Sequence, residues 1–228
     1  MSSKIPAAAS LAALLFLAVR LPAQAKRQSY PHMARVARYL MPRAAEMALA
    51  RSAAPPAVSA GATVLVLTPH GYVTAAKGTN GFVCLVERSW DSPFHSAKFW
   101  NRHIRGADCL NPPAVRSVLP LFLLRTKLAL TRRSQAGILA GLRAAVAAHR
   151  LPPLAPDSFS FMLSKHSYLT DSGGNLAHVM FFVSPVASSE MGADLPGSPV
   201  SLAGDFDVVP IAIFVVAVPQ WSDGTPAM

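Results

Sequence analysis

The sequence is poor in charged residues, in cysteine and in long apolar runs. Of its 228 residues, 14% are charged and 52% are hydrophobic, which is the composition of a folded chain and not of a disordered one. Outside residues 1–25, no apolar run approaches the roughly 20 residues that cross a bilayer. We therefore do not expect a multi-span membrane protein.

The signatures of the common enzyme classes are also missing. The chain has no G-x-S-x-G elbow, no H-E-x-x-H helix, no Walker phosphate loop, no G-x-G-x-x-G after a strand and no C-x-x-C pair. The glycines of residues 78–81 connect two expected strands, so they predict a hairpin turn and not a phosphate-binding loop. These absences favour a non-catalytic or ligand-binding protein as the leading functional expectation.

Residues 1–25 have the pattern of an export signal. Lys4 supplies the positive start, residues 5–19 form an uncharged block rich in alanine and leucine, and small residues end the segment at Ala25. We expect cleavage after Ala25, and a periplasmic or extracellular location. An organelle transit peptide is the competing interpretation, because no acidic residue precedes Glu46, and an uncleaved anchor is a third.

The chain has two cysteines, Cys84 and Cys109, which enclose 24 residues. An even cysteine count in an exported chain predicts one disulfide bond. A closed loop of this size contributes roughly 3 kcal/mol in the chain-entropy model. The alternative is that one cysteine is a nucleophile, although Cys84 lies in an apolar stretch where a thiol is normally inert.

Charge is divided unevenly along the chain. Residues 26–150, the basic half, hold 18 Lys and Arg against four acidic residues, whereas residues 151–228, the acidic half, hold only Lys165 against seven acidic residues. We expect the two halves to face one another within the fold. The alternative is that the basic half meets an anionic partner such as a membrane surface or nucleic acid, the latter being disfavoured because no basic tract is longer than a pair such as Arg132-Arg133.

The hydrophobic pattern predicts a single α+β domain over residues 42–228, preceded by a mobile basic arm at 26–41. We expect a mixed, mainly antiparallel sheet of about five or six strands packed against three helices. The expected helices cover residues 42–52, 115–130 with a kink at Pro120, and 135–150. The expected strands cover 62–68, 72–75 and 82–88, which form an antiparallel meander, then 159–164, 178–183 and 211–218, the last buried on both faces.

Histidines provide the only candidates for a metal or acid/base site. His166 and His178 flank the expected hairpin of 159–183, Asp171 lies in its connection, and Asp205 or Asp207 arrives from the final segment. Two imidazoles and a carboxylate could hold a Zn²⁺ ion or act as an acid/base pair in a small hydrolase. The alternative is that both histidines are ordinary hydrogen-bonding groups at strand ends.

The long irregular segment at residues 89–112 provides a second candidate site. Trp90 and Trp100 stand there near Arg102 and Arg105, and exposed aromatic side chains beside cations would form a recognition surface. The alternative is that this segment packs against the meander.

Four segments resemble a family of exported bacterial proteins of uncharacterised function. They are ALARSAAPP at 48–56, GTNGFVCLV at 78–86, RSVLP at 116–120 and HVMFF at 178–182. The resemblance extends from about residue 39 to the C-terminus. It implies an exported, single-domain bacterial protein, and it assigns no activity, cofactor or partner.

Overall fold

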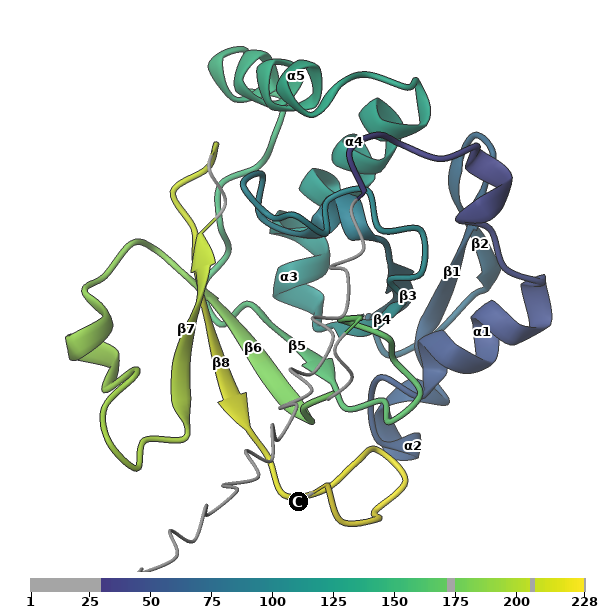
Figure 1. Cartoon of the computed structure of the whole chain (residues 1–228). Coiled ribbons are helices and arrows are strands. Elements are labelled where there is room, and N and C mark those ends of the chain that lie inside the picture. The colour runs from purple at the N-terminus through teal and green to yellow at the C-terminus, as the bar shows by residue number, and fades with distance from the viewer. Residues whose placement is uncertain (1–29, 172–174, 206–207, 228) are drawn as a thin grey trace, which may run out of the picture.

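The computed structural model describes residues 30–171, 175–205 and 208–227 (Figure 1). The expected export signal and Asp207 lie outside these ranges. The described residues form one mixed sheet of eight strands with five α-helices, so the α+β class is confirmed while both element counts exceed the prediction.

The strands follow the order β2-β1-β3-β4-β5-β6-β8-β7 across the sheet. Their bounds are β1 Thr63–Thr68, β2 Gly71–Ala76, β3 Val83–Glu87, β4 Gly106–Leu110, β5 Phe159–Met162, β6 His178–Val183, β7 Val200–Asp205 and β8 Ala212–Ala217. All neighbouring strands are antiparallel except β1 and β3, which are parallel.

The expected antiparallel meander is therefore wrong, because the first three strands do not pair in their order along the chain. Strand β3 pairs with β1 and not with β2, which folds back onto the outer side of β1. The physical reason is burial: the four central residues of β1 are buried and need cover on both sides, whereas Val73 and Thr74 of β2 are exposed, as an edge strand permits.

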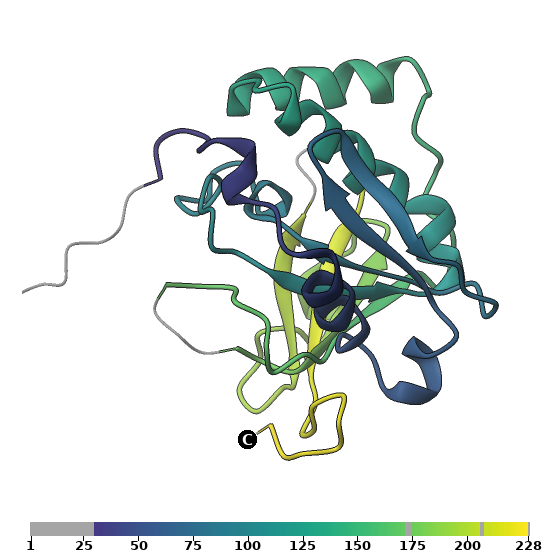
Figure 2. The same ribbon diagram turned by 90° about the vertical axis from the view of Figure 1, so that its right-hand side faces the viewer.

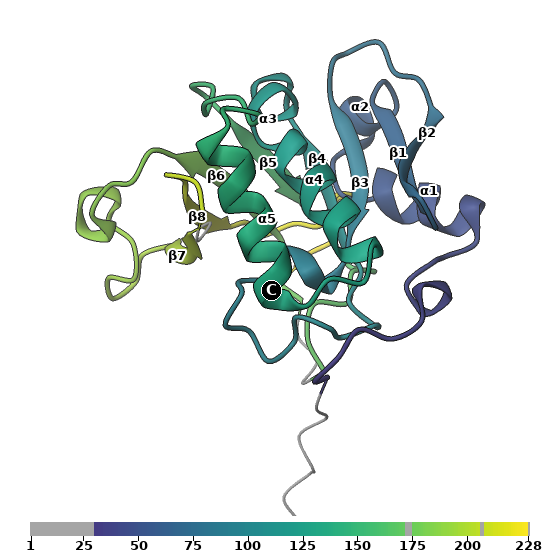
Figure 3. The ribbon, with the colours of Figure 1, turned by 90° about the horizontal axis from the view of Figure 1, so that it is seen from above.

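The helices cover both faces of the sheet (Figures 1 and 3). Their bounds are α1 Arg43–Arg51, α2 Pro56–Ser59, α3 Pro112–Ser117, α4 Leu119–Leu130 and α5 Gln135–Ala147, with short 3-10 helices η1 Val36–Arg38, η2 Ser89–Asp91 and η3 Ser188–Met191. Helix α1 packs on β1, β3 and β4, α3 and α4 pack on the opposite face, and α5 packs on α4.

The expected kinked helix is in fact two helices, α3 and α4. Pro120 lies in the first turn of α4, where the missing N–H of proline has no helical partner to lose. Ser134 caps α5, since its hydroxyl accepts a hydrogen bond from the Gly137 N–H. No helix in the described ranges is long and apolar enough to cross a bilayer.

Alternation along β3 divides the core into two layers, as the sequence predicts. Val83 and Leu85 pack with α3 and α4, whereas Cys84 and Val86 pack with Ala50 of α1 on the other face. The alternation therefore determines whether a β3 side chain faces α1 or faces α3 and α4.

The predicted disulfide is confirmed. Cys84 of β3 and Cys109 of β4 stand directly opposite one another in the antiparallel pair, and both are fully buried beneath α1. The bond therefore ties two central strands together.

Two strands, β4 and β7, are missing from the prediction. All five residues of β4 are buried, so the strand has no alternation of polar and apolar residues, and it contains Gly106 and Asp108. Strand β7 falls in a stretch rich in Gly, Pro and Ser. The expectation that the last strand is buried on both faces is wrong, because Ile213 and Val215 of β8 are only half-buried.

The expected mobile arm does not extend to residue 41. Tyr30 is buried and donates a hydrogen bond to Asp171 Oδ1 at 3.1 Å. Tyr39 is fully buried, and its hydroxyl donates to the Trp100 carbonyl oxygen at 3.0 Å. These two tyrosines anchor the segment because burial of each ring is combined with a satisfied hydroxyl.

Candidate anion-binding face

The histidines of the expected metal site have different environments. His178 begins β6 and is buried, with Nδ1 2.7 Å from the Leu176 carbonyl oxygen, and burial lowers its pKa. His166 is exposed in the connection after β5. In the ranges that the structure describes, no group of three His, Cys, Asp or Glu side chains is arranged to hold a metal ion. Asp207 lies outside those ranges.

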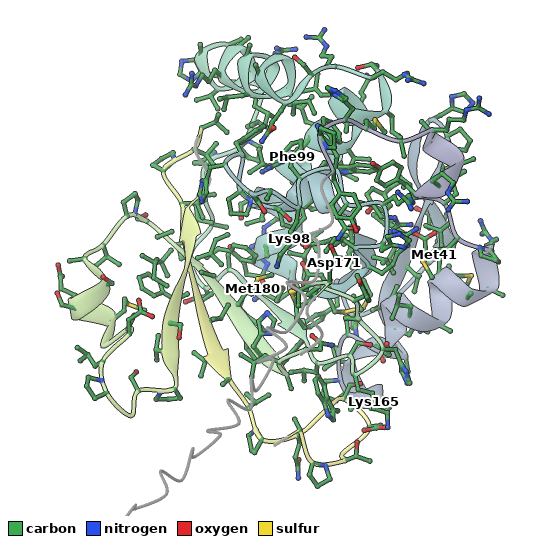
Figure 4. The ribbon with its side chains drawn as sticks, viewed as in Figure 1. Met41, Lys98, Phe99, Lys165, Asp171 and Met180 are labelled. Carbon is green, nitrogen blue, oxygen red and sulfur yellow. A yellow bond between two sulfur atoms is a disulfide. The ribbon has the colours of Figure 1, made fainter. Side chains whose placement is uncertain are left out.

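Asp171 is a structural tie between three segments. Its Oδ1 accepts hydrogen bonds from Tyr30 Oη at 3.1 Å, Asn101 Nδ2 at 2.9 Å and Tyr168 Oη at 2.8 Å. Slight burial raises the pKa of Asp171, but these three donors outweigh it and hold the pKa below its usual value. Figure 4 shows Asp171 beside the segment that carries Lys98 and Phe99.

The tryptophans of residues 89–112 are in the core. Trp90 is fully buried and donates from Nε1 to Thr126 Oγ1 at 3.0 Å, and Trp100 is 5% exposed with its ring edge-on to Phe99. The prediction of an exposed aromatic surface is therefore wrong at both tryptophans. The alternative, that residues 89–112 pack against the rest of the fold, is confirmed for these two side chains. Arg102 alone of the three predicted residues reaches the surface, where it is half-buried.

Arg102 lines a small cationic cavity of about 280 Å³, here called the arginine cavity. Its other lining residues are Ala37, Arg38, His103 and Arg105. They come from η1 and from the loop before β4, and the Tyr39–Trp100 hydrogen bond joins these segments (Figure 2).

The sequence prediction missed Arg38 as part of this site, because it assigned the residue to a mobile arm. The absence of any acidic residue before Glu46 is the signal that could have marked the segment.

A second, larger cavity has a volume of about 690 Å³ and shares no lining residue with the arginine cavity. Its walls are partly apolar and include His32 together with two cations, Arg132 and Arg133, from the α4–α5 connection. Trp100 lines this cavity and Arg102 lines the other, so chain geometry places their Cα atoms at most about 7 Å apart. We call the surface around both cavities the cationic face; it comprises His32, Arg38, Arg102, His103, Arg105, Arg132 and Arg133.

The acidic residues of the basic half do not neutralise this face. Glu46 and Asp108 are fully buried, and Glu87 and Asp91 are half-buried. Glu46 accepts from the buried Arg88 at 2.8 Å. Burial raises the pKa of Asp91 and of Asp108 to about 6.

The exposed charge of the basic half is therefore entirely positive within the part of the chain that the structure describes. It consists of eleven exposed side chains: Arg35, Arg38, Arg43, Lys77, Lys98, Arg116, Lys127, Arg132, Arg133, Arg143 and Arg150.

The ion pairs that the structure describes do not join the two halves. Glu46–Arg88 lies within the basic half, and Lys165–Asp223, at 2.6 Å, lies within the acidic half at the other end of the molecule from Phe99 (Figure 4). The contacts between the halves at Asp171 are hydrogen bonds from Tyr30 and Asn101, so the expectation that the halves face one another stays a prediction.

Comparison with known proteins gives no relative. No protein-family model, no curated protein and no solved structure matches the chain.

Proposed function

We propose that this chain is an exported, non-catalytic binding protein whose basic half attaches to an anionic, phosphate-bearing membrane surface. The observation that carries the proposal is the sorting of charge. All four acidic residues of the basic half are withdrawn from the surface wholly or in part, while eleven Lys and Arg side chains are exposed. A surface of one sign attracts partners of the other.

The choice of a membrane over nucleic acid follows from the expected compartment. The disulfide between Cys84 and Cys109 favours an oxidising environment, and residues 1–25 have the pattern of an export signal. Outside the cytoplasm, anionic lipid headgroups are a more accessible phosphate surface than nucleic acid. The hydrolase alternative based on His166 and His178 has no comparable support.

The expected strength of membrane attachment follows from the number of cations near the membrane surface. Each Lys or Arg near an anionic membrane contributes about 1 kcal/mol, and the attraction falls off within a Debye length of about 10 Å at moderate salt. Removing two exposed cations of the cationic face should therefore weaken binding by about 2 kcal/mol, or roughly thirtyfold.

The test is cosedimentation of the purified protein with phosphatidylglycerol-containing vesicles, at low and at high salt. Pure phosphatidylcholine vesicles measure any contribution from the apolar residues 1–25. We expect binding that needs the anionic lipid, that salt reverses, and that the double variant Arg132→Gln, Arg133→Gln weakens. The double variant Arg116→Gln, Arg143→Gln is the matched control, since it removes two exposed arginines that line neither cavity.

Two results would contradict the proposal. One is equal binding to both vesicle types with no effect of salt. The other is displacement of the protein from anionic vesicles by a short DNA duplex at equal phosphate concentration, which would assign the surface to nucleic acid.

A further inference from the structure

The arginine cavity has a chemistry more specific than that of the surface around it. Three arginines and one histidine line a space of about 280 Å³. That volume is just below the range of roughly 300–1,000 Å³ of pockets for drug-sized ligands, so it suits one small group. A ligand in this cavity would extend the proposed function and rests on it, because the cavity lies within the cationic face.

Arg105 is held in place by backbone carbonyls. Its Nη1 donates to the carbonyl oxygens of Arg102 at 3.0 Å and Ile104 at 2.6 Å, and its Nη2 donates to that of Arg38 at 3.3 Å. These bonds fix one guanidinium and also join the two segments that form the cavity. A guanidinium held in advance loses less rotamer entropy when a ligand binds.

Arg102 supplies an unsatisfied donor. Its Nε is shielded from solvent and has no hydrogen-bond partner among the described residues. Because Nε itself is closed to solvent, a ligand in the cavity would meet the rest of the Arg102 guanidinium group.

One carboxylate acts on these cations from outside the cavity, since the charge of Glu46 raises the pKa of Arg105. No acidic residue lines the cavity, and Asp171 on the neighbouring loop already accepts three hydrogen bonds at one oxygen. Burial and the charge of Arg88 both lower the pKa of Arg105, to about 10.

We infer that the arginine cavity binds a single phosphate group, either free or at the end of a lipid headgroup. Planar guanidinium groups pair with phosphate through two parallel hydrogen bonds, and phosphate offers more acceptor oxygens and more charge than a carboxylate. Arg38, Arg102 and Arg105 are the binding residues, and His103 lies at the exposed rim.

The experiment is a calorimetric titration of the full chain with inorganic phosphate, with chloride at matched ionic strength as the reference. We expect saturable phosphate binding that Arg38→Gln weakens by at least about tenfold, as loss of a charge-assisted hydrogen bond implies. Arg35→Gln is the matched control, because Arg35 is exposed just before η1 and does not line the cavity. It should leave phosphate affinity unchanged.

The variant Arg102→Lys distinguishes a phosphate site that depends on guanidinium geometry from attraction by positive charge alone. Lysine keeps the positive charge but loses Nε and the planar fork, so the inference expects phosphate affinity to fall. Unchanged affinity in this variant, equal losses in Arg35→Gln and Arg38→Gln, or no preference for phosphate over chloride would each overturn it. The thermal unfolding midpoint of every variant is measured. Phosphate affinities are compared only among variants whose midpoint matches that of the parent.

The two sources of phosphate are distinguished with vesicles of phosphatidic acid, whose headgroup ends in a phosphate monoester. Competition by inorganic phosphate for these vesicles supports a headgroup ligand, whereas saturation by phosphate without competition supports a free one. If vesicles of phosphatidylglycerol bind but phosphate does not, the proposed function stands and this inference fails. If phosphate binds but no anionic vesicle does, the inference stands and the proposed function fails.

Discussion

The two halves of the chain treat their acidic residues in opposite ways. In the basic half, Glu46 and Asp108 are buried, and Glu87 and Asp91 are half-buried. In the acidic half, all five acidic side chains whose exposure the structure describes are exposed: Asp157, Asp171, Glu190, Asp194 and Asp223. Sequence counts alone suggest mutual neutralisation, but burial determines which charges reach solvent.

Burying acids in one half has a physical cost that the fold offsets unevenly. Glu46 is compensated at one oxygen: Oε1 accepts from Arg88 Nη2 at 2.8 Å and from the Leu67 N–H at 3.0 Å, while Oε2 has no hydrogen-bond partner among the described residues. Asp108 lies on the sheet face beneath α3 and α4, and neither of its oxygens has a hydrogen-bond partner among the described residues. Glu46 is thus paired with a cation, whereas Asp108 has Ser160 and Glu87 beside it and no ion pair among the described residues.

The largest expected effect is on the buried ion pair. Arg88→Met leaves Glu46 buried without its partner and also removes the bond from Arg88 Nε to the Tyr39 carbonyl oxygen, 2.8 Å long. We expect a loss of about 3–5 kcal/mol in the free energy of unfolding, measured with urea. Lys165→Met, which breaks the exposed pair with Asp223, should cost far less, because solvent screens that pair. Similar losses in both variants would remove the contrast between the halves.

The disulfide is expected to have the next largest effect. The double variant Cys84→Ala, Cys109→Ala opens a loop with a sequence separation of 25 residues, which should lower the free energy of unfolding by about 3 kcal/mol. Urea unfolding of the parent with and without reductant gives an independent value. A double variant as stable as the oxidised parent would show that the cross-link contributes nothing.

The variant Asp108→Asn measures how much the buried Asp108 carboxylate lowers the free energy of unfolding. The folded pKa of Asp108 is raised from 3.8 to about 6, so its stabilising contribution is full below about pH 4 and is lost as the pH rises through 6. The Asp108→Asn variant has no carboxyl group to ionise at this position. We therefore expect its free energy of unfolding to exceed that of the parent by about 2 kcal/mol at pH 8 and by little at pH 4. Glu87, Asp91 and Arg125 adjoin the group, so unfolding is followed over the whole pH range. A gain that is the same at both pH values would contradict the assignment.

Exposed charges should have the smallest effect on stability in either half. Arg143→Gln on α5 and Glu190→Gln on η3 each alter an exposed side chain. We expect changes within about 0.5 kcal/mol for both. A larger change in thermal unfolding for Arg143→Gln would mean that the exposed cations serve folding and not binding.

Local patterns in the sequence predict much of the fold. The alternation of β3, the start of α1 after Pro42, the Ser134 cap and the Cys84–Cys109 bond all follow from residues close to the element concerned or from a simple count. Strand β4 does not, because a strand buried on both faces loses its alternation.

The site depends on long-range contacts that no local pattern encodes. Tyr39 must meet Trp100, and Asp171 must meet Tyr30, before Arg38 can lie beside Arg105. The same contacts bury Trp100, for which the sequence allows either an exposed surface or a packed segment. Charge counts indicated an unusual basic half, but only the fold distinguishes exposed cations from buried acids.

The measurement that tests this account most directly is the salt dependence of binding to phosphatidylglycerol-containing vesicles, in two triple variants. Arg38→Gln, Arg132→Gln and Arg133→Gln remove exposed cations of the cationic face; Asp157→Asn, Glu190→Gln and Asp194→Asn remove exposed acids from the acidic half. We predict that the first variant binds more weakly with a shallower salt dependence, and that the second behaves like the parent. Stronger binding by the second variant, as large as the weakening in the first, would show that net charge alone matters and would contradict the account.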